Sequence, residues 1–459
     1  MQLNTVLLMS GGAVQALQLL AALSLLILLH EFGHFFFARL FKTRVEKFYL
    51  FFDFLFPFPN VLNFSLFKKK KGDTEYGLGW FPLGGYVKIA GMVDESMDKE
   101  AMKQPPQPWE YRSKKAYQRL LIMLGGIIMN LLTAMVIYAV VFGVWGEEYL
   151  PAENAKYGIA ADSVAESIGL RDGDKVVSIG GQPVERFNSI VKDIIFNEAK
   201  TMQVIRDGQM VEIPLPAGTI RKLTKRQRLT AITPRVPTVV EVVSAKSAAE
   251  EMGLKKGDSI IAGNGSPMAF YDQLEDWKRA NAGKHVEITV MRNNAPVVLA
   301  GVIPENGILG FQRDYILTNY FETKVVKYGF IEAIGKGFSY TSEQVGNYWN
   351  GLKFLFTSPE VKVSENLGGL VSFGKMFSPV FDWQDFLMLT AFVSIILAIM
   401  NLLPIPGLDG GYVIFLIFEM LSGRKVSDKV METANTVGLV LLLGLMLYAN
   451  GMDIFRLFK

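Results

Sequence analysis

The sequence predicts a polytopic α-helical membrane protein, with four transmembrane helices and two inserted mixed α/β domains. Two observations predict this fold class. Several long stretches of the chain carry no charged residue, and the region between two of them contains the same pattern twice. The composition agrees, because 50% of the 459 residues are hydrophobic and only 20% are charged. A disordered chain could not hold so much apolar side chain at this charge density.

Cysteine is absent from the sequence, and the formal net charge is only +3. The missing cysteine excludes disulfides, thiolate zinc sites, iron–sulfur clusters and a cysteine nucleophile. The small net charge gives no reason to expect nucleic acid as a partner. Histidine is rare, and two of the three histidines, His30 and His34, lie four positions apart.

Four charge-free stretches are long enough to cross a bilayer or nearly so, because a spanning helix needs roughly 20 apolar residues. A buried core helix is the alternative for any one stretch, but such helices rarely recur four times at this length. The first stretch is not expected to be a cleaved signal peptide, because it lacks a basic start and runs directly into charged residues. The four stretches are residues 1–29, 120–146, 386–408 and 433–452.

Basic residues predict how these helices are oriented. Four spans place both termini on the same side as the region between the second and third helices. The loops on the other side carry basic residues, including Lys42 and Arg44 after the first helix, Arg119 before the second and Lys425 before the fourth. The positive-inside rule makes those loops cytoplasmic and places the inserted domains outside. In a Gram-negative bacterium this means the inner membrane, with the inserted domains in the periplasm.

The region between the second and third helices contains an internal repeat. Residues 163–174 match residues 247–258 at one constant offset, with Gly-Leu-x-x-Gly-Asp in both copies. Each copy continues into short β-branched runs separated by glycine turns, which predicts two small mixed α/β domains. His285 falls in one such run and is expected to be an ordinary exposed strand residue. The pattern resembles bacterial PDZ domains, which bind an extended peptide or peptide end as an added strand. The alternative is that the copies are spacers with empty grooves.

These patterns divide the chain into five parts. Residues 1–146 hold the first two transmembrane helices and their connecting loop, and residues 386–459 hold the last two. Residues 155–235 and 236–305 are the two PDZ-like domains, and residues 306–385 are expected to form a linker with amphipathic helices.

The sequence His30-Glu31-Phe32-Gly33-His34 is the clearest functional pattern in the chain. Residues four apart lie on one helix face, so both imidazoles can reach a single ion. Zinc suits two imidazoles, a carboxylate and one open position, and Glu31 can act on a water at that position. Chance and ordinary packing are the alternative, but ionisable groups are costly inside a membrane segment. Counting ~1.5 Å per residue back from Arg39 places the pair inside the bilayer, near its cytoplasmic face.

A third protein ligand is needed, and Asp409 is the best candidate. It is the only acidic residue in the range 386–418, and it follows Pro404 and Pro406. Prolines at alternate positions cannot continue a helix, so the third helix should end near Leu403 and run on as extended chain. Asp-Gly alone would indicate a turn. Its place at the end of an apolar span, on the same side as the histidines, favours a ligand.

The combination of His-Glu-x-x-His with Asn-x-x-Pro-x-Pro-x-Leu-Asp-Gly resembles the site-2 protease family of intramembrane zinc metalloproteases, over essentially the whole chain. The resemblance implies a zinc ion held by His30, His34 and Asp409, with Glu31 activating the water that attacks a peptide carbonyl. It also implies substrates that are single transmembrane helices, typically an anti-sigma factor already cut on its outer side.

Residues 82–87 are similar to the re-entrant β-loop of that family. Gly84 and Gly85 would let backbone approach a substrate, and strand pairing at Tyr86 would unwind the substrate helix and expose its amides. The simpler interpretation of the two glycines is a hairpin turn. Asn130 and Asn401 match family asparagines that either bond a substrate strand or hold two helices together.

The sequence departs from the family pattern at two prolines, which are Ile127 and Leu370 here. Both changes concern local backbone and substrate preference, since the metal motifs are intact. Two other functions stay open, a non-catalytic PDZ membrane scaffold and a zinc transporter, although Glu31 beside paired ligands favours hydrolysis. The run Lys68–Lys71 is either a solvated loop or a contact with anionic lipid headgroups.

Overall fold

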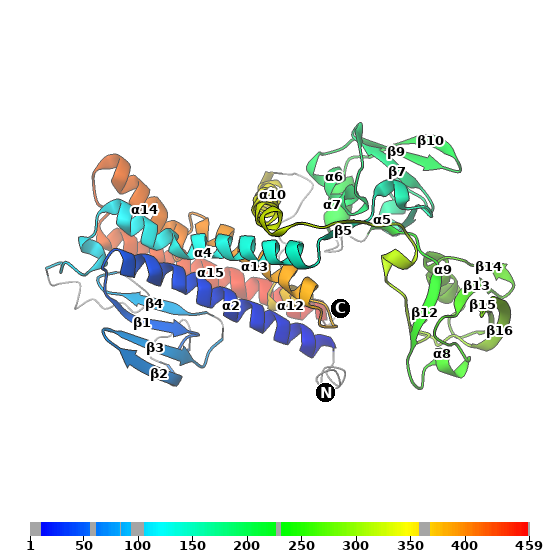
Figure 1. The fold of residues 1–459 in the computed structure, drawn as a ribbon, viewed down its shortest axis with the longest axis horizontal. Helices are drawn as coiled ribbons and strands as arrows, with labels where there is room; N and C mark the ends of the chain where they lie inside the picture. The colour runs from blue at the N-terminus through cyan, green and yellow to red at the C-terminus, as the bar shows by residue number, and fades with distance from the viewer. Residues whose placement is uncertain are drawn as a thin grey trace. The chain divides into compact units, whose positions relative to one another are not determined.

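The computed structural model describes residues 11–55, 61–82, 84–92, 105–225, 231–357 and 368–457. The chain divides into two compact units (Figure 1). The helical unit comprises Met1–Gly146, Lys327–Lys353 and Leu367–Lys459, and the repeat unit comprises Glu147–Val326 and Phe354–Asn366. Leu83 of the expected re-entrant loop and residues 1–10 of the first apolar stretch lie outside the described residues.

Four helices of the helical unit are long and apolar enough to cross a membrane, which confirms the four predicted spans within the described residues. Each coincides with one charge-free stretch of the sequence. The first helix also carries the His-Glu-x-x-His motif within its last three turns. The four are α2 (Gly11–Leu40), α4 (Ala116–Val144), α13 (Trp383–Leu402) and α15 (Asp428–Leu457).

Helices α2 and α4 cross at a pair of glycines. A Cβ atom on Gly33 would lie 2.1 Å from the carbonyl oxygen of Gly125, and one on Gly125 would lie 2.5 Å from the oxygen of Gly33. Neither position can therefore hold a side chain without moving the helices apart. Small residues allow this close backbone approach between membrane helices, and here the crossing lies within the metal-binding motif.

A four-stranded sheet follows α2, in the order β2-β3-β1-β4. Strand β1 pairs in parallel with β3 and antiparallel with β4, so β2 and β4 are the two edges. The sheet packs on α2 through aromatic rings, with Phe35 and Phe48 centroids 5.5 Å apart. The strands are β1 (Val45–Leu50), β2 (Ser65–Lys71), β3 (Thr74–Gly79) and β4 (Tyr86–Ile89).

The segment after α13 differs from the expectation in one respect. Helix α13 ends at Leu402, as the two prolines predict, but residues 403–408 form bends and a turn rather than extended chain, and α14 (Asp409–Ser422) begins directly after them. Asp409 therefore lies in the first turn of a helix, not in a turn. A Cβ on Gly410 would lie 2.2 Å from the oxygen of Leu403, so glycine is what lets α14 fold back on the end of α13.

Two further helices of the chain, α10 (Phe330–Thr357) and α12 (Leu370–Gly374), lie in the segment expected to be a linker with amphipathic helices. Helix α10 packs closely on α4, because a Cβ on Gly337 would lie 2.6 Å from the oxygen of Met135. The N-terminus of α12 is held by Asp453 of α15, whose carboxylate accepts the N–H groups of Gly369 and Ser372.

The repeat unit contains two groups of strands and helices in a similar order, each around its own hydrophobic core. Each has a short helix and a longer helix beside a sheet. In each, the first strand pairs with the last one, β6 with β11 in the first repeat and β12 with β17 in the second. The first repeat has sheets β10-β9-β7-β8 and β11-β6, and the second has β16-β15-β13-β12-β17 with β14 on β13. His285 is an exposed residue of β15, as predicted. The elements of the first repeat are β6 (Ile159–Ala161), α5 (Ser163–Glu166), β7 (Lys175–Ile179), β8 (Gln182–Pro183), α6 (Ile190–Phe196), β9 (Thr201–Arg206), β10 (Gln209–Pro214), α7 (Thr219–Lys225) and β11 (Ile232–Pro234). Those of the second are β12 (Thr238–Val243), α8 (Ala248–Glu251), β13 (Ser259–Gly263), β14 (Ser266–Pro267), α9 (Tyr271–Ala280), β15 (His285–Arg292), β16 (Ala295–Val302) and β17 (Phe311–Arg313), and β5 (Glu147–Tyr149) pairs with β18 (Lys324–Val326) beside them.

The shared Gly-Leu-x-x-Gly-Asp motif has one structural role in both copies. Its glycines have φ between 82° and 96°, a left-handed conformation that favours glycine. Its aspartate accepts two hydrogen bonds from an arginine, Arg206 to Asp174 at 2.7 and 2.8 Å and Arg292 to Asp258 at 2.6 and 2.7 Å. Burial alone would raise the pKa of Asp258, but these bonds, a backbone N–H and the guanidinium charge hold it below its ordinary value.

Candidate metal centre and active site

Three side chains from distant parts of the chain converge at the C-terminal third of α2. The Nε2 atoms of His30 and His34 are 3.2 Å apart, and they lie 3.3 and 3.4 Å from Oδ2 of Asp409. Tetrahedral zinc with ligand bonds of about 2.0–2.1 Å separates its ligand atoms by about 3.3 Å. The three atoms therefore already form one face of a tetrahedron of the right size, and the fourth corner is left for a reactant.

The histidines are held with one ring nitrogen turned toward that face. Nδ1 of His34 lies 2.8 Å from the carbonyl oxygen of Ile122, so it carries the proton and leaves Nε2 as a lone pair. Nδ1 of His30 lies 3.2 Å from the side-chain amide of Asn130. The amide oxygen of Asn130 is buried, and no described residue donates to it. Turning this amide by a half-rotation would let the oxygen accept the Nδ1 proton and free Nε2 of His30 as well.

Buried Oδ2 of Asp409 also receives no hydrogen bond of good geometry from any described residue. A buried carboxylate oxygen that faces two imidazole lone pairs would be unfavourable without a cation. Two imidazoles and one carboxylate are a donor set that zinc prefers. The residues present therefore fit a zinc ion.

Gly126 makes room for both imidazoles. A Cβ atom at this position of α4 would lie 2.4 Å from Cε1 of His30 and 2.6 Å from Nε2 of His34. The backbone of α4 thus forms a wall of the metal site, and only a residue without a side chain fits there. The sequence signals this only indirectly, through two successive glycines in an otherwise apolar helix.

Helix α14, which carries Asp409, is attached to α4 by a buried ion pair. Arg119 donates to Glu419 at 2.5 Å, and the two side chains are only 10% and 14% exposed. A charged side chain this far from water requires a partner of opposite charge, because an unpaired buried charge is costly. The pair fixes the far end of α14 and so helps to set the position of Asp409 at its start.

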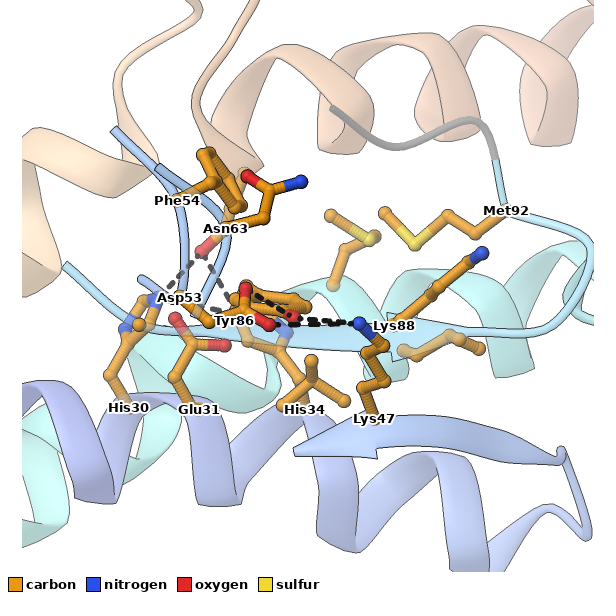
Figure 2. A pocket seen from close by; sticks show the side chains of 15 residues that line it. His30, Glu31, His34, Lys47, Asp53, Phe54, Asn63, Tyr86, Lys88 and Met92 are labelled. Atoms are coloured by element: carbon orange, nitrogen blue, oxygen red, sulfur yellow. Dashed lines mark hydrogen bonds and ion pairs between the residues drawn. The ribbon is translucent and has the colours of Figure 1, made fainter. Parts of the chain in front are cut away.

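A cavity of about 300 Å³ opens above the metal site (Figure 2). Glu31 points into it from α2 together with His30 and His34, and strand β4 forms another wall. A Cβ on Gly85 would lie 2.7 Å from the oxygen of Tyr49 and 3.4 Å from Cγ of Glu31, so this glycine lets the start of β4 approach Glu31. The cavity therefore joins the three candidate ligands, a carboxylate and the edge of a sheet.

Several polar residues of the cavity were not expected from the sequence. They are Lys47, Asp53, Asn63 and Lys88, which surround the expected Tyr86. Tyr86 donates to Asp53 at 3.0 Å, and Lys47 lies 3.4 Å from the hydroxyl of Tyr86. The ring of Tyr86 stacks on Tyr49 with centroids 5.3 Å apart. These residues come from strands β1 and β4 and from the segment between β1 and β2, so only the folded sheet brings them together.

Three of the expected substrate-contacting residues, Gly84, Asn130 and Asn401, are not among the described residues that line this cavity. Gly84 faces the ring of Phe52, where a Cβ would lie 2.4 Å away, and Asn401 is half-buried near the end of α13. Asn130 contacts His30, and its backbone oxygen accepts a hydrogen bond from Ser394 of α13.

The two positions without the family prolines have clear local structures. Ile127 is buried within α4, which runs unbroken from Ala116 to Val144. The N–H of Leu370 donates to the side-chain oxygen of Asn450 at 3.0 Å, a bond that proline could not make.

The chain matches the family model of peptidase family M50 over residues 18–445. It is 30% identical to a putative zinc metalloprotease of Neisseria meningitidis, over 95% of this chain and 98% of the relative. It is also 30% identical to the regulator of sigma-E protease RseP of Escherichia coli and to the protease RseP of Yersinia pestis, in each case over 94% of this chain and 96% of the relative. These similarities favour a protease over a scaffold or a zinc transporter. With a zinc-fitting donor set beside a glutamate and a match along nearly its whole length, the chain belongs to peptidase family M50 and is a zinc metalloprotease.

Proposed function

We propose that this metalloprotease cuts single transmembrane helices within the bilayer, with His30, His34 and Asp409 as zinc ligands and Glu31 as the catalytic base. The observation that carries the proposal is the cavity in which the three ligand atoms, Glu31 and the edge strand β4 meet. The ligands belong to helices that are long enough to span a membrane or that directly follow one. Cleavage at this site is therefore cleavage inside the membrane.

Bound zinc would polarise the substrate carbonyl and make a water acidic near neutral pH. Glu31 lies beside the ligands and can accept the proton of the attacking water as its oxygen bonds to the carbonyl carbon. The same carboxyl then donates the proton to the amide nitrogen as the carbon–nitrogen bond breaks. Proton transfer, attack and bond cleavage thus balance through one residue.

Strand β4 supplies what a helical substrate lacks, an extended backbone. The amides of a helical substrate are hydrogen-bonded and shielded by lipid, so the substrate helix must unwind before an amide can be attacked. Strand β4 pairs with β1 on one side, and the structure describes no partner on its other side. A substrate segment paired there as an added strand would pass over Glu31, with Gly85 and Tyr86 as the contacting residues. This is the role of a re-entrant β-loop.

The two repeats act as PDZ-like domains that bind a substrate's extended end. In the second repeat a cavity of about 410 Å³ lies between α9 and residues 306–311, lined by Tyr271, Lys278 and Ile308 among others. Strand β17 borders it and ends the sheet order, so a peptide could add to its edge. Spacers with empty grooves remain the alternative that a peptide-binding measurement would decide.

The substrate class follows from the relatives and from the site. Three relatives are named regulator of sigma-E protease, and a membrane-bound anti-sigma factor, already cut on its outer side, fits a site that accepts one helix. The protein lies in a bacterial inner membrane, with the metal site near the cytoplasmic face and the repeats outside. Basic residues of the loops, such as Arg119 and Lys425, support this orientation.

Cleavage of a tagged single transmembrane helix by the full-length protein tests this function. We expect Glu31→Gln to retain zinc but to lose cleavage by about 100-fold or more, as removal of a general base does. Asp409→Asn should lose both zinc and cleavage, and a zinc chelator should abolish wild-type cleavage. Glu305→Gln, an exposed glutamate of the second repeat, is the matched control and should cleave normally.

Undiminished cleavage by Glu31→Gln would disprove the mechanism. Zinc flux across vesicles that is lost in Asp409→Asn, with no cleavage by the wild type, would instead support a transporter. Full function of Glu31→Gln in a cell would support a scaffold.

A further inference from the structure

Strand β2 forms the edge of the four-stranded sheet that lies opposite β4. Its side chains are exposed along almost its whole length, and neither the metal site nor the cavity uses them. Together with the residues just before it, this edge has two chemically different halves. The first half presents large apolar side chains that are 42% to 63% exposed, and the second half is the run Lys68–Lys71; the apolar residues are Val61, Leu62, Phe64, Leu66 and Phe67.

Contacts with α2 give the direction of the sheet relative to the membrane. Val45, at the start of β1, belongs to the same core cluster as Ala38, close to the cytoplasmic end of α2. Phe48 contacts Phe35, one turn deeper. Gly85 lies against Glu31, a further turn deeper. Strand β1 therefore runs from the cytoplasmic end of α2 back toward the level of the metal site.

Strand pairing carries this depth scale outward to β2. Lys69 pairs through β3 with Phe48, which lies at the level of Phe35. Phe67 pairs through β3 with Leu50, close to the level of the metal site. Residues before Phe67 continue away from the cytoplasmic face. The backbone of the lysines thus lies between the level of Phe35 and the cytoplasmic end of α2, and the apolar residues lie deeper, toward the level of the metal site.

This order along one exposed edge matches the order of a bilayer leaflet. We propose that residues 61–67 insert into the hydrocarbon of the cytoplasmic leaflet and that the ammonium groups of Lys68–Lys71 bind the phosphates of anionic phospholipids. Lysine ammonium groups near a membrane surface attract anionic headgroups, and long lysine side chains extend to the interface when their backbone lies deeper. The proposal rests on the membrane placement of α2 and not on the identity of the substrate.

Lipid contact at β2 also has a consequence for the opposite edge. Lysines on an edge strand disfavour pairing with a further strand, so an added strand is directed to β4. A sheet anchored in lipid by β2 keeps β4 beside Glu31, because the four strands are hydrogen-bonded as one unit. The lipid-binding edge thus supports the geometry of the cavity, which it reaches directly only at Asn63.

The absence of cysteine allows a direct test on the full-length protein, since single cysteines can be labelled without background. In nanodiscs that contain phosphatidylcholine and phosphatidylglycerol, a spin label at Phe67→Cys should collide with oxygen rather than with a water-soluble nickel complex. A label at Lys70→Cys should show the reverse preference. A nickel-accessible label at Phe67 would overturn the insertion.

Lipid selectivity is measured with a fluorophore at Phe67→Cys and with doxyl-labelled lipids. We expect phosphatidylglycerol to quench at least about threefold more than phosphatidylcholine. Glutamine at Lys68–Lys71 should reduce this ratio to about one, whereas arginine should preserve it. Glutamine at the exposed Lys255 and Lys256 of the second repeat should leave it unchanged. Equal quenching by the two lipids in the wild type would overturn the proposal. So would a glutamine variant that loses cleavage equally in purely zwitterionic nanodiscs, because the lysines would then bind protein and not lipid.

Discussion

Gly126 offers the sharpest single test of how the metal site is built. In Gly126→Ala the new Cβ would lie 2.4 Å from Cε1 of His30 and 2.6 Å from both Nδ1 of His30 and Nε2 of His34. Ordinary carbon contacts begin near ~3.5 Å, so the rings must retreat by about 1 Å. They have no room, since the two Nε2 atoms are already 3.2 Å apart and Nδ1 of His34 is bonded to Ile122. Metal–ligand distances tolerate only about 0.2 Å.

The expected result is a folded protein with a defective site. Alanine favours a helix interior over glycine by about 1 kcal/mol, which partly offsets the strain. We expect zinc affinity to fall by about 100-fold, which corresponds to about 2.8 kcal/mol. Cleavage at limiting zinc should fall at least as far. Zinc content of the purified protein and cleavage of a tagged membrane helix measure both effects.

The matched control for this prediction is Gly143→Ala in the same helix. Its Cβ would lie 3.3 Å from the Cβ of Ala333, a close contact that small movements can relieve. This variant should keep normal zinc content and cleavage. Wild-type zinc content and cleavage in Gly126→Ala would refute the claim that the α4 backbone forms a wall of the site.

Two further predictions concern ion pairs away from the ligands. Arg119→Met leaves Glu419 buried without its partner and should destabilise the helical unit by about 3–5 kcal/mol. The double variant with Glu419→Leu should recover most of that loss, as measured by thermal unfolding in detergent. A double variant no more stable than the single one would contradict this prediction. The depressed pKa of Asp258 stabilises the second repeat fully above pH ~4, the ordinary value of an unfolded aspartate, and this contribution is lost as the pH falls through the lower folded-state value. The stability difference between the wild type and Asp258→Asn, followed by hydrogen exchange of β15 with intrinsic rates corrected for pH, should therefore be large at pH 7 and should shrink on acidification, and a difference that grows on acidification would contradict the assigned cause.

Much of the site could be predicted because ionisable side chains are energetically unfavourable inside an apolar membrane segment. Histidines and a glutamate inside an apolar stretch require a reason, and their spacing of four residues gives one. Asp409 could be selected because the third apolar span ends in an isolated carboxylate. The structure adds that these residues, which come from opposite ends of the sequence, lie close together in space.

Other parts could not be predicted, since they depend on contacts between distant segments. The sequence near Asp409 does not show that a new helix begins there. The two preceding prolines predict extended chain, and no local pattern marks where that chain would end. The need for glycine at Gly126 arises only from rings on another helix. Lys47 reaches the cavity through the register of β1 with β4, and a shift of one residue would turn it to the other face.

The position of Asp409 at the start of α14 also has a consequence for biosynthesis. The ribosome produces both histidines and Glu31 early, when almost all of the chain is still to be made, and the carboxylate ligand follows only near the end. A nascent chain therefore has the proposed base but an incomplete proposed donor set while its first two helices enter the membrane. With the ligand set proposed above, we expect proteolytic activity to appear only after Asp409 and the last helices are in place.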